Sequence, residues 1–503
     1  MLVAVLSGLL ANNLLFTVFV VALPTVATGL HTSVATITWV VTGPMLTYGV
    51  AAPLAGKVSD IRGHRRTYIL GMVFSVVVAL GSALAPDAGM LVAARALSGV
   101  AGAVVGASSM AVVFDAFDPS ERVKAMGWWS LVGAGGPVLG IAIGGPLIEY
   151  LGWRSLFVLQ IPLILAALAL ALFVLPASLV RTGERVRLFA RDVPRRPGRF
   201  IGPGAARAEP GASAGEPASD PASDPASDPA SDPASARTGL LGRLDLGGAV
   251  LVTLAVGGLL LALNRAPELG WGSPAVLLML AGSVAFAIGF VVVERRAAEP
   301  LVPLSYLRER NFTFPIGAQV FANFAYMGGF FLAPLLFEQV FGYGVSAAGL
   351  LSIPRPLVFS LVAPGAGYFA QRLGTRGAAL AGTLAVVASM GVFMLAGGGG
   401  GVFVAEAALV LSGIGLGVAT PALSAAVGNV ADAASLGIVS ATQQLMVQVG
   451  VVAGIQVMQT LQAGAARSGS QVAGPGLAGS FHYAFGIGGI VALLGVACAA
   501  ATR

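Results

Sequence analysis

The sequence predicts an all-α polytopic membrane protein, one whose helices cross a membrane many times. Of its 503 residues, 56% are hydrophobic and only 10% are charged, and the mean hydropathy is +0.88. Apolar runs of eighteen or more residues recur along the whole chain, and each can cross a bilayer as a helix. Helices satisfy their own backbone hydrogen bonds, which lipid cannot do. The 69 glycines suit close packing between such helices.

Fourteen candidate spans follow one another along the chain. They lie near residues 6–28, 34–55, 68–86, 90–112, 126–149, 155–177, 245–264, 274–294, 312–338, 346–370, 377–396, 402–424, 437–461 and 481–501. The first run lacks a basic region and an A-x-A cleavage site, so we interpret it as a span and not as a cleaved signal peptide.

A long polar segment separates the sixth span from the seventh. It begins rich in arginine and ends in the repeat PASDPASDPASDPASDPAS. A repeat of this composition cannot bury an apolar core, so we expect it to be disordered. We therefore divide the chain into a six-helix half at 1–177, a cytoplasmic linker at 178–243, two inserted helices at 244–295 and a second six-helix half at 296–503.

A trace of internal symmetry supports this 6 + 2 + 6 division. The segment GKVSDIRGHRR, 56–66, follows the second span, and GYFAQRLGTR, 367–376, follows the tenth. Both read glycine, three residues, a polar residue, two residues, glycine and then a basic residue. If the seventh and eighth spans are an insert, the tenth is the second span of a second, parallel half.

The distribution of basic residues predicts the orientation. With a cytoplasmic N-terminus and alternating spans, 23 of the 28 Lys and Arg fall on the cytoplasmic side and three fall outside. Without the nine at residues 181–237 of the linker the ratio is still 14 to 3, and cytoplasmic loops carry such an excess. We expect both termini in the cytoplasm, and we attribute the net charge of +6 to these loops and not to nucleic-acid binding.

The segment 56–66 places a short cluster of charged residues between two apolar runs. Its candidate functional residues are Gly56, Asp60, Arg62, Gly63, Arg65 and Arg66. Glycines permit tight helix ends and a sharp turn. The Asp60 carboxylate can pair with a neighbouring arginine or lie at a helix N-terminus, where the dipole favours an anion. Alternatively, the charges only determine the topology.

This segment resembles the signature loop of the major facilitator superfamily, with Ile61 where an arginine is usual. Further similarity follows in WVVTGPMLTYG (39–49), ARALSGVAGAVVGAS (94–108), the Gly-Pro helix with its W-R-x-x-F turn (135–162) and EPLVPLSYLRERNF (299–312). Together these motifs are similar to the fourteen-span drug:proton antiporters. The resemblance implies export by alternating access, and a signature loop that latches the two halves together in one state of the cycle.

Two arginines lie inside predicted spans, where charges are costly and usually functional. The resemblance implies that Arg95, in span four, takes part in proton coupling; the alternative is an arginine satisfied by carbonyls for packing. Arg355, in span ten, is flanked by Pro354 and Pro356, so we expect a kinked helix with free carbonyls. It is either a cation of the substrate cavity or a feature of the kink.

Polar side chains follow helical faces in three spans: Asn13 and Thr17 in the first, Gln319, Asn323 and Tyr326 in the ninth, and Ser440, Gln444 and Gln448 in the thirteenth. Such stripes face protein or water. We interpret them as the wall of a substrate cavity, or alternatively as interhelical hydrogen bonds. In the fifth span, small residues allow close helix packing. The resemblance marks it as the export-motif helix, through Gly136, Pro137, Gly140, Gly144 and Gly145.

One feature of the drug:proton antiporters is missing. Leu15 replaces the acid of their first span, Val20 replaces an Asn there, and Pro44 replaces a usual Tyr. No Asp or Glu lies at the middle of a predicted span, and Glu406 is the least peripheral candidate for coupling. Proton antiport needs a group that alternates between charged and neutral. The chain therefore either couples through a group such as Glu406 or carries neutral or anionic substrates.

We expect a secondary active transporter of the cell membrane that exports drug-like or metabolite molecules, coupled to protons and surrounded by lipid. The alternatives are an uptake or facilitated carrier of a neutral or anionic solute, and a transport-inactive sensor with the same fold. A membrane enzyme would need clustered acids or a Cys/His site, which the sequence lacks. There is no ATP-binding P-loop. We expect no cofactor, no metal site, no nucleic-acid partner and a monomer.

Overall fold

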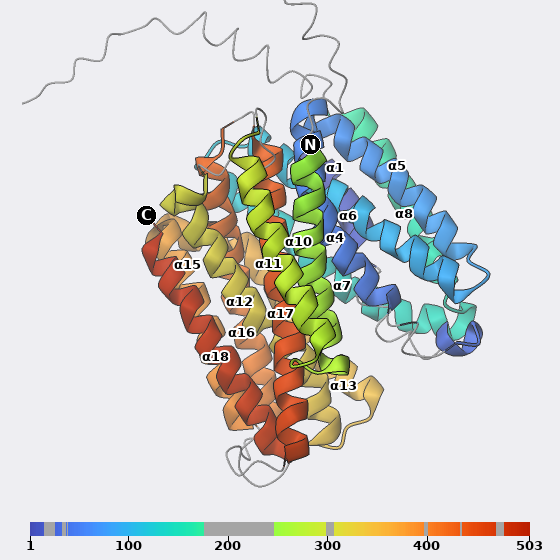
Figure 1. The fold of residues 1–503 in the computed structure, drawn as a ribbon, viewed down its shortest axis with the longest axis vertical. Helices are drawn as coiled ribbons and strands as arrows, with labels where there is room; N and C mark the ends of the chain where they lie inside the picture. The colour runs from blue at the N-terminus through green and yellow to red at the C-terminus, as the bar shows by residue number, and fades with distance from the viewer. Residues whose placement is uncertain are drawn as a thin grey trace, which may run out of the picture.

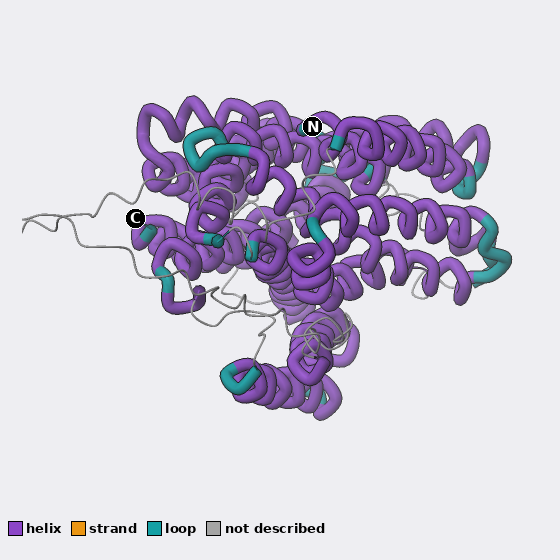
Figure 2. Tube along the Cα trace, turned by 90° about the horizontal axis from the view of Figure 1, so that it is seen from above, coloured by secondary structure: helices purple, strands orange, loops and turns teal. Residues whose placement is uncertain are grey.

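The computed structural model describes residues 1–14, 26–32, 37, 39–175, 246–297, 306–396, 401–432, 435–468 and 477–502. The predicted linker at 178–243 and Thr17 lie outside these residues. Over the described ranges the chain consists of helices and loops, with no strand (Figure 2). The prediction of an all-α fold is confirmed.

Between residues 39 and 174 the N-terminal half consists of long helices joined by short loops (Figure 1). Its described helices are α1 (Leu2–Asn13), α4 (Trp39–Arg62), α5 (His64–Ala83), α6 (Ala88–Ala116), α7 (Arg122–Leu151) and α8 (Ser155–Val174). Two further helices follow, α10 (Leu246–Leu269) and α11 (Pro274–Glu294).

The C-terminal half follows after the short 3-10 helix η3 (Tyr306–Arg308). Its helices are α12 (Arg310–Gln339), α13 (Val345–Leu351), α14 (Pro354–Val362), η4 (Ala363–Gly365), α15 (Ala366–Leu395), α16 (Gly401–Val430), α17 (Leu436–Ser468) and α18 (Leu477–Ala501).

Each half has its own apolar core. Tyr68, Met72 and Phe114 belong to the core of the N-terminal half, and Phe393 and Phe485, whose rings stack 4.5 Å apart, belong to that of the C-terminal half. Helices α4 and α17 pack against each other where the two halves meet. Helix α10 contacts both of them, and α11 lies on α10 (Figure 1).

The helix bundle has two ends, which we distinguish by name. We call the end with Asp60 and Leu436 the latch end, and the opposite end, where α7 and α12 finish at Leu151 and Gln339, the far end. Helix α1 begins at the latch end, and helix α18 ends there (Figure 1).

The number of membrane spans is confirmed only in part. Among the described residues, nine helices are long and apolar enough to cross a membrane, and Leu2–Asn13 and Gly247–Leu263 are shorter apolar helices. One of the nine, Ala347–Leu395, covers the predicted tenth and eleventh spans. The count of fourteen, and with it the 6 + 2 + 6 division, therefore stays a prediction.

Proline and glycine interrupt the helices at three informative positions. The tenth predicted span is broken, because α13 ends at Leu351 and α14 begins at Pro354, and proline cannot donate the hydrogen bond that would continue the first helix. Gly63 and Gly374 adopt φ angles of 90° and 73°, a region that glycine enters without strain. These two glycines hold the same place in the repeated segments 56–66 and 367–376.

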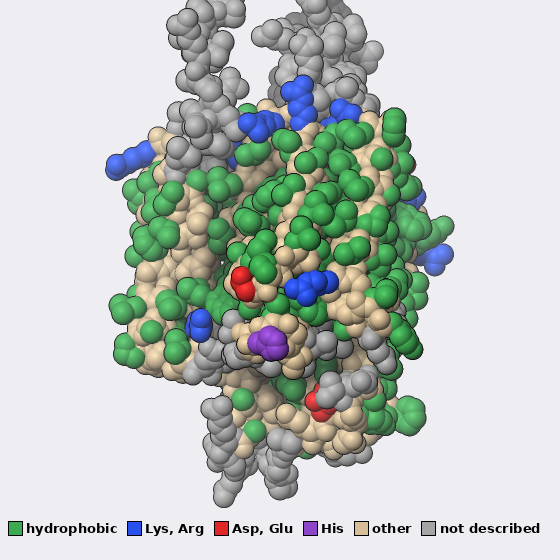
Figure 3. Space-filling model, turned by 90° about the vertical axis from the view of Figure 1, so that its right-hand side faces the viewer, with side chains coloured by type: hydrophobic (Ala, Val, Ile, Leu, Met, Phe, Trp, Pro, Cys, Tyr) green, Lys and Arg blue, Asp and Glu red, His purple; other side chains and the backbone are tan. Residues whose placement is uncertain are grey.

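The outer surface is suited to lipid. Leu70, Val77, Leu80 and Val158, on α5 and α8, are between 44% and 58% exposed. Figure 3, which faces this side of the molecule, shows hydrophobic side chains over most of the surface and Lys and Arg mainly toward its upper edge. In water such a surface would be costly, whereas in a bilayer it meets hydrocarbon.

Candidate functional site

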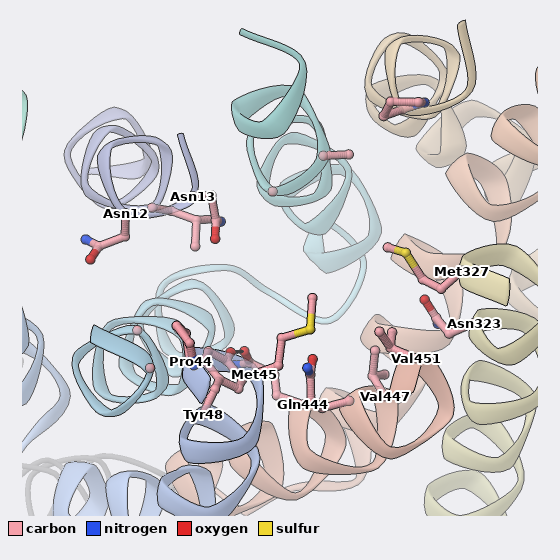
Figure 4. A pocket seen from close by; sticks show the side chains of 18 of the residues that line it. Asn12, Asn13, Pro44, Met45, Tyr48, Asn323, Met327, Gln444, Val447 and Val451 are labelled. Atoms are coloured by element: carbon pink, nitrogen blue, oxygen red, sulfur yellow. Dashed lines mark hydrogen bonds between the residues drawn. The ribbon is translucent and has the colours of Figure 1, made fainter. Parts of the chain in front are cut away.

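A cavity of about 610 Å³ lies between the two halves, within the range common for small-molecule sites. Asn12 and Asn13 from α1 and Gln444 from α17 border the same space (Figure 4). On α12 the lining extends from Gln319 to Leu335, which is about 24 Å at 1.5 Å per residue. The cavity is thus large enough for a drug-sized molecule.

Most of the predicted cavity residues do line this space. They are Asn13, Gln319, Asn323, Tyr326, Gln444 and Gln448. Thr17 lies outside the described residues. Arg355 is the exception, because its side chain is fully buried behind the wall and does not border the cavity.

A polar network lies in the wall of the C-terminal half. The Gln443 Nε2 donates to Gln319 Oε1 over 3.0 Å and to Ser424 Oγ over 2.7 Å, which links α17, α12 and α16. The Gln319 Nε2 and the Gln443 Oε1 are buried and have no hydrogen-bond partner among the described residues. An unsatisfied buried polar group costs about 1–3 kcal/mol, so a polar group of a ligand would be stabilised here.

A second polar contact joins the halves across the cavity. The Tyr48 hydroxyl, on α4, donates to Gln444 Oε1 on α17, and both residues border the cavity (Figure 4). One turn further along α17, the Gln448 Nε2 is buried without a partner among the described residues. The polar stripe of α17 therefore serves both contact between the halves and the cavity wall.

The Arg355 guanidinium is buried among aromatic rings. Its Cζ lies 3.9 Å from the ring centroid of Tyr326 and 5.9 Å from that of Phe330, and both rings border the cavity. None of its three nitrogens has an acceptor of ordinary hydrogen-bond geometry among the described residues, and the polar group that interacts with them is the Tyr326 hydroxyl. Sequence reasoning expected free carbonyls at the proline kink to solvate this group, but cation–π contacts surround it instead.

The signature segment 56–66 contacts the other half directly. The Asp60 carboxylate accepts hydrogen bonds from the backbone N–H groups of Gly437 over 2.6 Å and Ile438 over 2.8 Å, at the start of α17. The free N–H groups and the helix dipole favour an anion there, but burial outweighs them and raises the pKa of the Asp60 carboxyl to about 7. A Cβ on Gly56 would lie 2.5 Å from the Ala441 Cβ, so glycine permits the close approach of the two helices.

The arginines of this segment are either exposed to solvent or bonded within their own half. Arg62 and Arg66 are exposed, and Arg65 donates from Nη2 to the Leu172 carbonyl of α8 over 3.2 Å, within its own half. The contact between the halves thus relies on the aspartate and the glycine of the segment.

Arg122 makes a second contact between the halves at the latch end. Its Nη1 donates to the Gly428 carbonyl over 2.7 Å and to Asn429 Oδ1 over 3.0 Å, at the end of α16. Its Nη2 donates to the Phe114 carbonyl near the end of α6 over 2.8 Å. One guanidinium therefore caps two helix C-termini, where a cation is favoured.

Comparison with known proteins identifies the family. The family model described as the Major Facilitator Superfamily matches residues 5–455. The chain belongs to the Major Facilitator Superfamily. The match to a transporter family confirms the prediction that the chain is a transporter.

The relatives of this major facilitator include export proteins. The chain is 27% identical over 462 residues to the "Tetracenomycin C resistance and export protein" of Streptomyces glaucescens, covering 92% of this chain and 75% of the relative. It is 27% identical over 399 residues to the "Multidrug resistance protein Stp" of Mycobacterium tuberculosis strain H37Rv, covering 79% of this chain but only 62% of that relative.

A solved structure shares the fold. The human organic anion transporter MFSD10 (TETRAN) superposes with a TM-score of 0.61 at 16% identity, over 99% of this chain and 98% of that one. Identity this low establishes the major facilitator fold alone. Together with the family match, it supports the prediction of a multi-pass membrane protein.

The two candidate coupling residues of this major facilitator lie in different places. Arg95 borders the cavity and donates from Nε to the Val40 carbonyl over 3.2 Å. Glu406, on α16, is not among the residues that border it, and its Oε1 is buried without a hydrogen-bond partner among the described residues. The structure does not bring the two together at one site, and their role in coupling remains a prediction.

The export-motif helix, α7, packs through its glycines. A Cβ on Gly136 would lie 3.2 Å from the Asn13 Cβ of α1, and one on Gly135 would lie 3.4 Å from Ser360 Oγ of α14. Gly140 is buried. The surroundings of Pro137, Gly144 and Gly145 lie outside the described side chains. Helix α7 therefore contacts both halves close to the cavity.

Sequence reasoning missed three residues that the structure places at the site. Gln443 lies one position off the predicted stripe of α17, although a pair of adjacent glutamines in an apolar span is itself a signal. Tyr48 falls in the segment WVVTGPMLTYG but on no polar stripe. Arg122 follows a polar loop, and nothing in its local sequence indicates an acceptor 306 residues away.

Proposed function

We propose that this major facilitator exports small, largely apolar organic compounds across the cell membrane by alternating access, with proton entry as the driving reaction. The observation that carries the proposal is a drug-sized cavity between two halves that are joined at the latch end. The Asp60 and Arg122 contacts close that end, while the lining continues along α12 and α17 to Leu335 and Gln459, toward the far end.

The basic residues also support an orientation of the bundle. The latch end carries the charged segment 56–66, and the predicted cytoplasmic loops hold basic residues in the ratio of 14 to 3. With the latch end in the cytoplasm, the Asp60 and Arg122 contacts close the cytoplasmic side of the cavity in this conformation, a state that a transporter of either direction visits. The resistance and export functions named for the relatives support export as the direction of transport.

Proton coupling needs a titrating group, and the described cavity lining contains no Asp or Glu. The half-buried Glu406, whose Oε1 has no described hydrogen-bond partner, is the candidate that we propose. Because Glu406 lies outside the cavity wall, protons and substrate would use separate places in the C-terminal half, and conformational change would couple them.

The test is proton movement in proteoliposomes that enclose a pH-sensitive dye, challenged with a panel of aromatic antibiotics. We expect substrate-dependent proton flux in the wild type, its loss in Glu406→Gln, and retention of substrate binding in that variant. Glu338→Gln, near the far end of α12, is the matched control. Substrate movement without proton flux would instead favour a facilitated carrier, which the acid-free cavity wall also suits.

A further inference from the structure

The C-terminal half holds a buried positive charge to which no described carboxylate is hydrogen-bonded. Arg355 is 0% exposed, and its guanidinium nitrogens have no acceptor of ordinary hydrogen-bond geometry among the described residues, with the Tyr326 hydroxyl as the neighbouring polar group. A buried cation without a counter-charge is strongly destabilising, whereas an anion nearby offsets that cost. The cation–π contact with Tyr326 offsets only part of it.

This charge lies directly behind the cavity wall. Gly349, Ser352, Pro356 and Phe359 border the cavity, and Arg355 is the residue immediately before Pro356 on the same short helix, α14. The Tyr326 ring, which stacks on the guanidinium at 3.9 Å, itself borders the cavity. One aromatic ring therefore separates the charge from the space that a ligand would occupy.

The remaining wall does not counter this charge. Among the described residues that border the cavity there is no Asp or Glu, and the charged residue among them is Arg95, from the opposite half. The Gln319 and Gln448 Nε2 groups add buried donors without a described partner on the same side. In a site shielded from water, charges act over longer distances than in solution. An anion is therefore favoured in this cavity and a cation is disfavoured.

From these observations we infer that the substrate class is organic acids, compounds with an apolar body and a carboxylate, and that Arg355 is the residue that determines this preference. The inference rests on the proposed function, because it names the substrate class of the proposed cavity. The carboxylate would lie on the C-terminal side near Tyr326, the cavity-wall ring that stacks on the Arg355 guanidinium. The apolar body would pack against Met327, Phe330 and Val451.

The test uses three ligands of similar size and different charge: 1-naphthaleneacetic acid, its methyl ester and 1-naphthylethylamine. Equilibrium dialysis at neutral pH measures their binding to the purified wild-type chain. We expect the acid to bind about tenfold more tightly than the ester, a ratio that corresponds to ~1.4 kcal/mol of charge attraction, and the amine to bind most weakly.

Two variants assign the preference to Arg355. In Arg355→Met, which keeps the length and apolar stem, we expect the acid and the ester to bind equally. In Arg355→Lys, which keeps the charge, the acid should remain preferred. Ester binding also reports that each variant is folded.

Each outcome decides the question. A wild-type chain that binds the ester as tightly as the acid, or an Arg355→Met variant that keeps the acid preference, overturns the inference and leaves the proposed function standing. If neither the acid nor the ester binds, the inference and the proposed small-molecule cavity fail together.

Discussion

The repeated segments 56–66 and 367–376 have the same backbone design but make different contacts at the latch end. In the first, Asp60 accepts two backbone hydrogen bonds from the start of α17. In the second, Gln371 stands at the equivalent place and is exposed. Both segments turn at a glycine with positive φ, Gly63 and Gly374. The repeat thus preserves the turn, and only one copy carries the charge.

The glycines that begin the two segments also differ in their surroundings. A Cβ on Gly56 would overlap the Gly437 carbonyl, 2.6 Å away, which is backbone, whereas a Cβ on Gly367 would meet the flexible side chain of Lys124 at 2.5 Å. One junction between the halves is therefore rigid and charge-assisted, and the other is adaptable. We infer that the α4–α17 junction stabilises the conformation seen here, and that the junction of α7 with α14 and α15 adapts when the conformation changes.

The largest effect is expected for Gly56→Ala. Its Cβ would lie 2.5 Å from the Ala441 Cβ and 2.6 Å from the Gly437 carbonyl, so α4 and α17 must move apart. We expect the initial rate of export from proteoliposomes to fall at least about tenfold, equivalent to ~1.4 kcal/mol. Gly391→Ala, where nothing lies within 4 Å of the added Cβ, is the control. Wild-type rates in Gly56→Ala would show that this approach is dispensable.

Asp60→Asn removes the charge at the start of α17 and keeps one acceptor oxygen. Hydrogen bonds to a charged group contribute about 1.5–3 kcal/mol, so the latch end should open more often. The measurement is the maleimide labelling rate of Ser424→Cys, a site now 1% exposed, in a Cys498→Ser background that removes the single native cysteine. We expect labelling about tenfold faster than in the parent, and an unchanged rate would contradict a latching role.

Arg122→Met should have a smaller effect in the same labelling assay. It loses the cap on the ends of α16 and α6, but the half-exposed side chain is partly screened by water. We expect a threefold to tenfold increase, an order-of-magnitude range for a partly exposed cap. Arg122→Lys should recover only part of it, since one ammonium cannot reproduce a fork that bonds two helices. Full recovery by lysine would mean that charge alone matters.

The smallest effect is expected for Gln371→Asp, which supplies the missing acid in the second segment. Gly367 packs on Lys124 near the start of α7. An aspartate at position 371, one turn after Gly367, would therefore approach the N-terminus of α7. The N-cap residue of α7, Glu121, is already an acid. We expect labelling of Ser424→Cys to slow by about twofold, as for an exposed charge near a helix end. Faster labelling would show that the two segments are not equivalent in space.

Much of the fold was predictable because hydropathy marks where helices meet lipid. The ninth predicted span, 312–338, became α12 with two more residues at its start and one more at its end. The latch-end extensions were not predictable in this way: α4 continues to Arg62 and α16 to Val430, beyond predicted ends at 55 and 424. Polar residues can continue a helix outside the membrane, and hydropathy carries no signal for that.

The cavity wall was predictable where a polar stripe repeats along one helix, as for Gln319, Asn323 and Tyr326. Contacts between distant segments were not. Arg122 binds Gly428 and Asn429 through the packing of the two halves, which local sequence does not encode. Which way the Arg355 side chain points depends on how α14 is rotated about its axis after the break in the tenth predicted span. Helix α14 has only nine residues, too few for its sequence pattern to show which face meets the cavity.

We infer that Asp60, and not its counterpart Gln371, holds the latch end closed and the far end apart. Spin labels at Leu151 and Tyr343, exposed sites near the far ends of α7 and α12, allow the separation of the halves to be measured by pulsed electron paramagnetic resonance in the Cys498→Ser background. We predict that Asp60→Asn shifts the distances toward shorter values and that Gln371→Asn leaves them at the wild-type values. Equal shifts in both variants, or none in Asp60→Asn, would contradict the account.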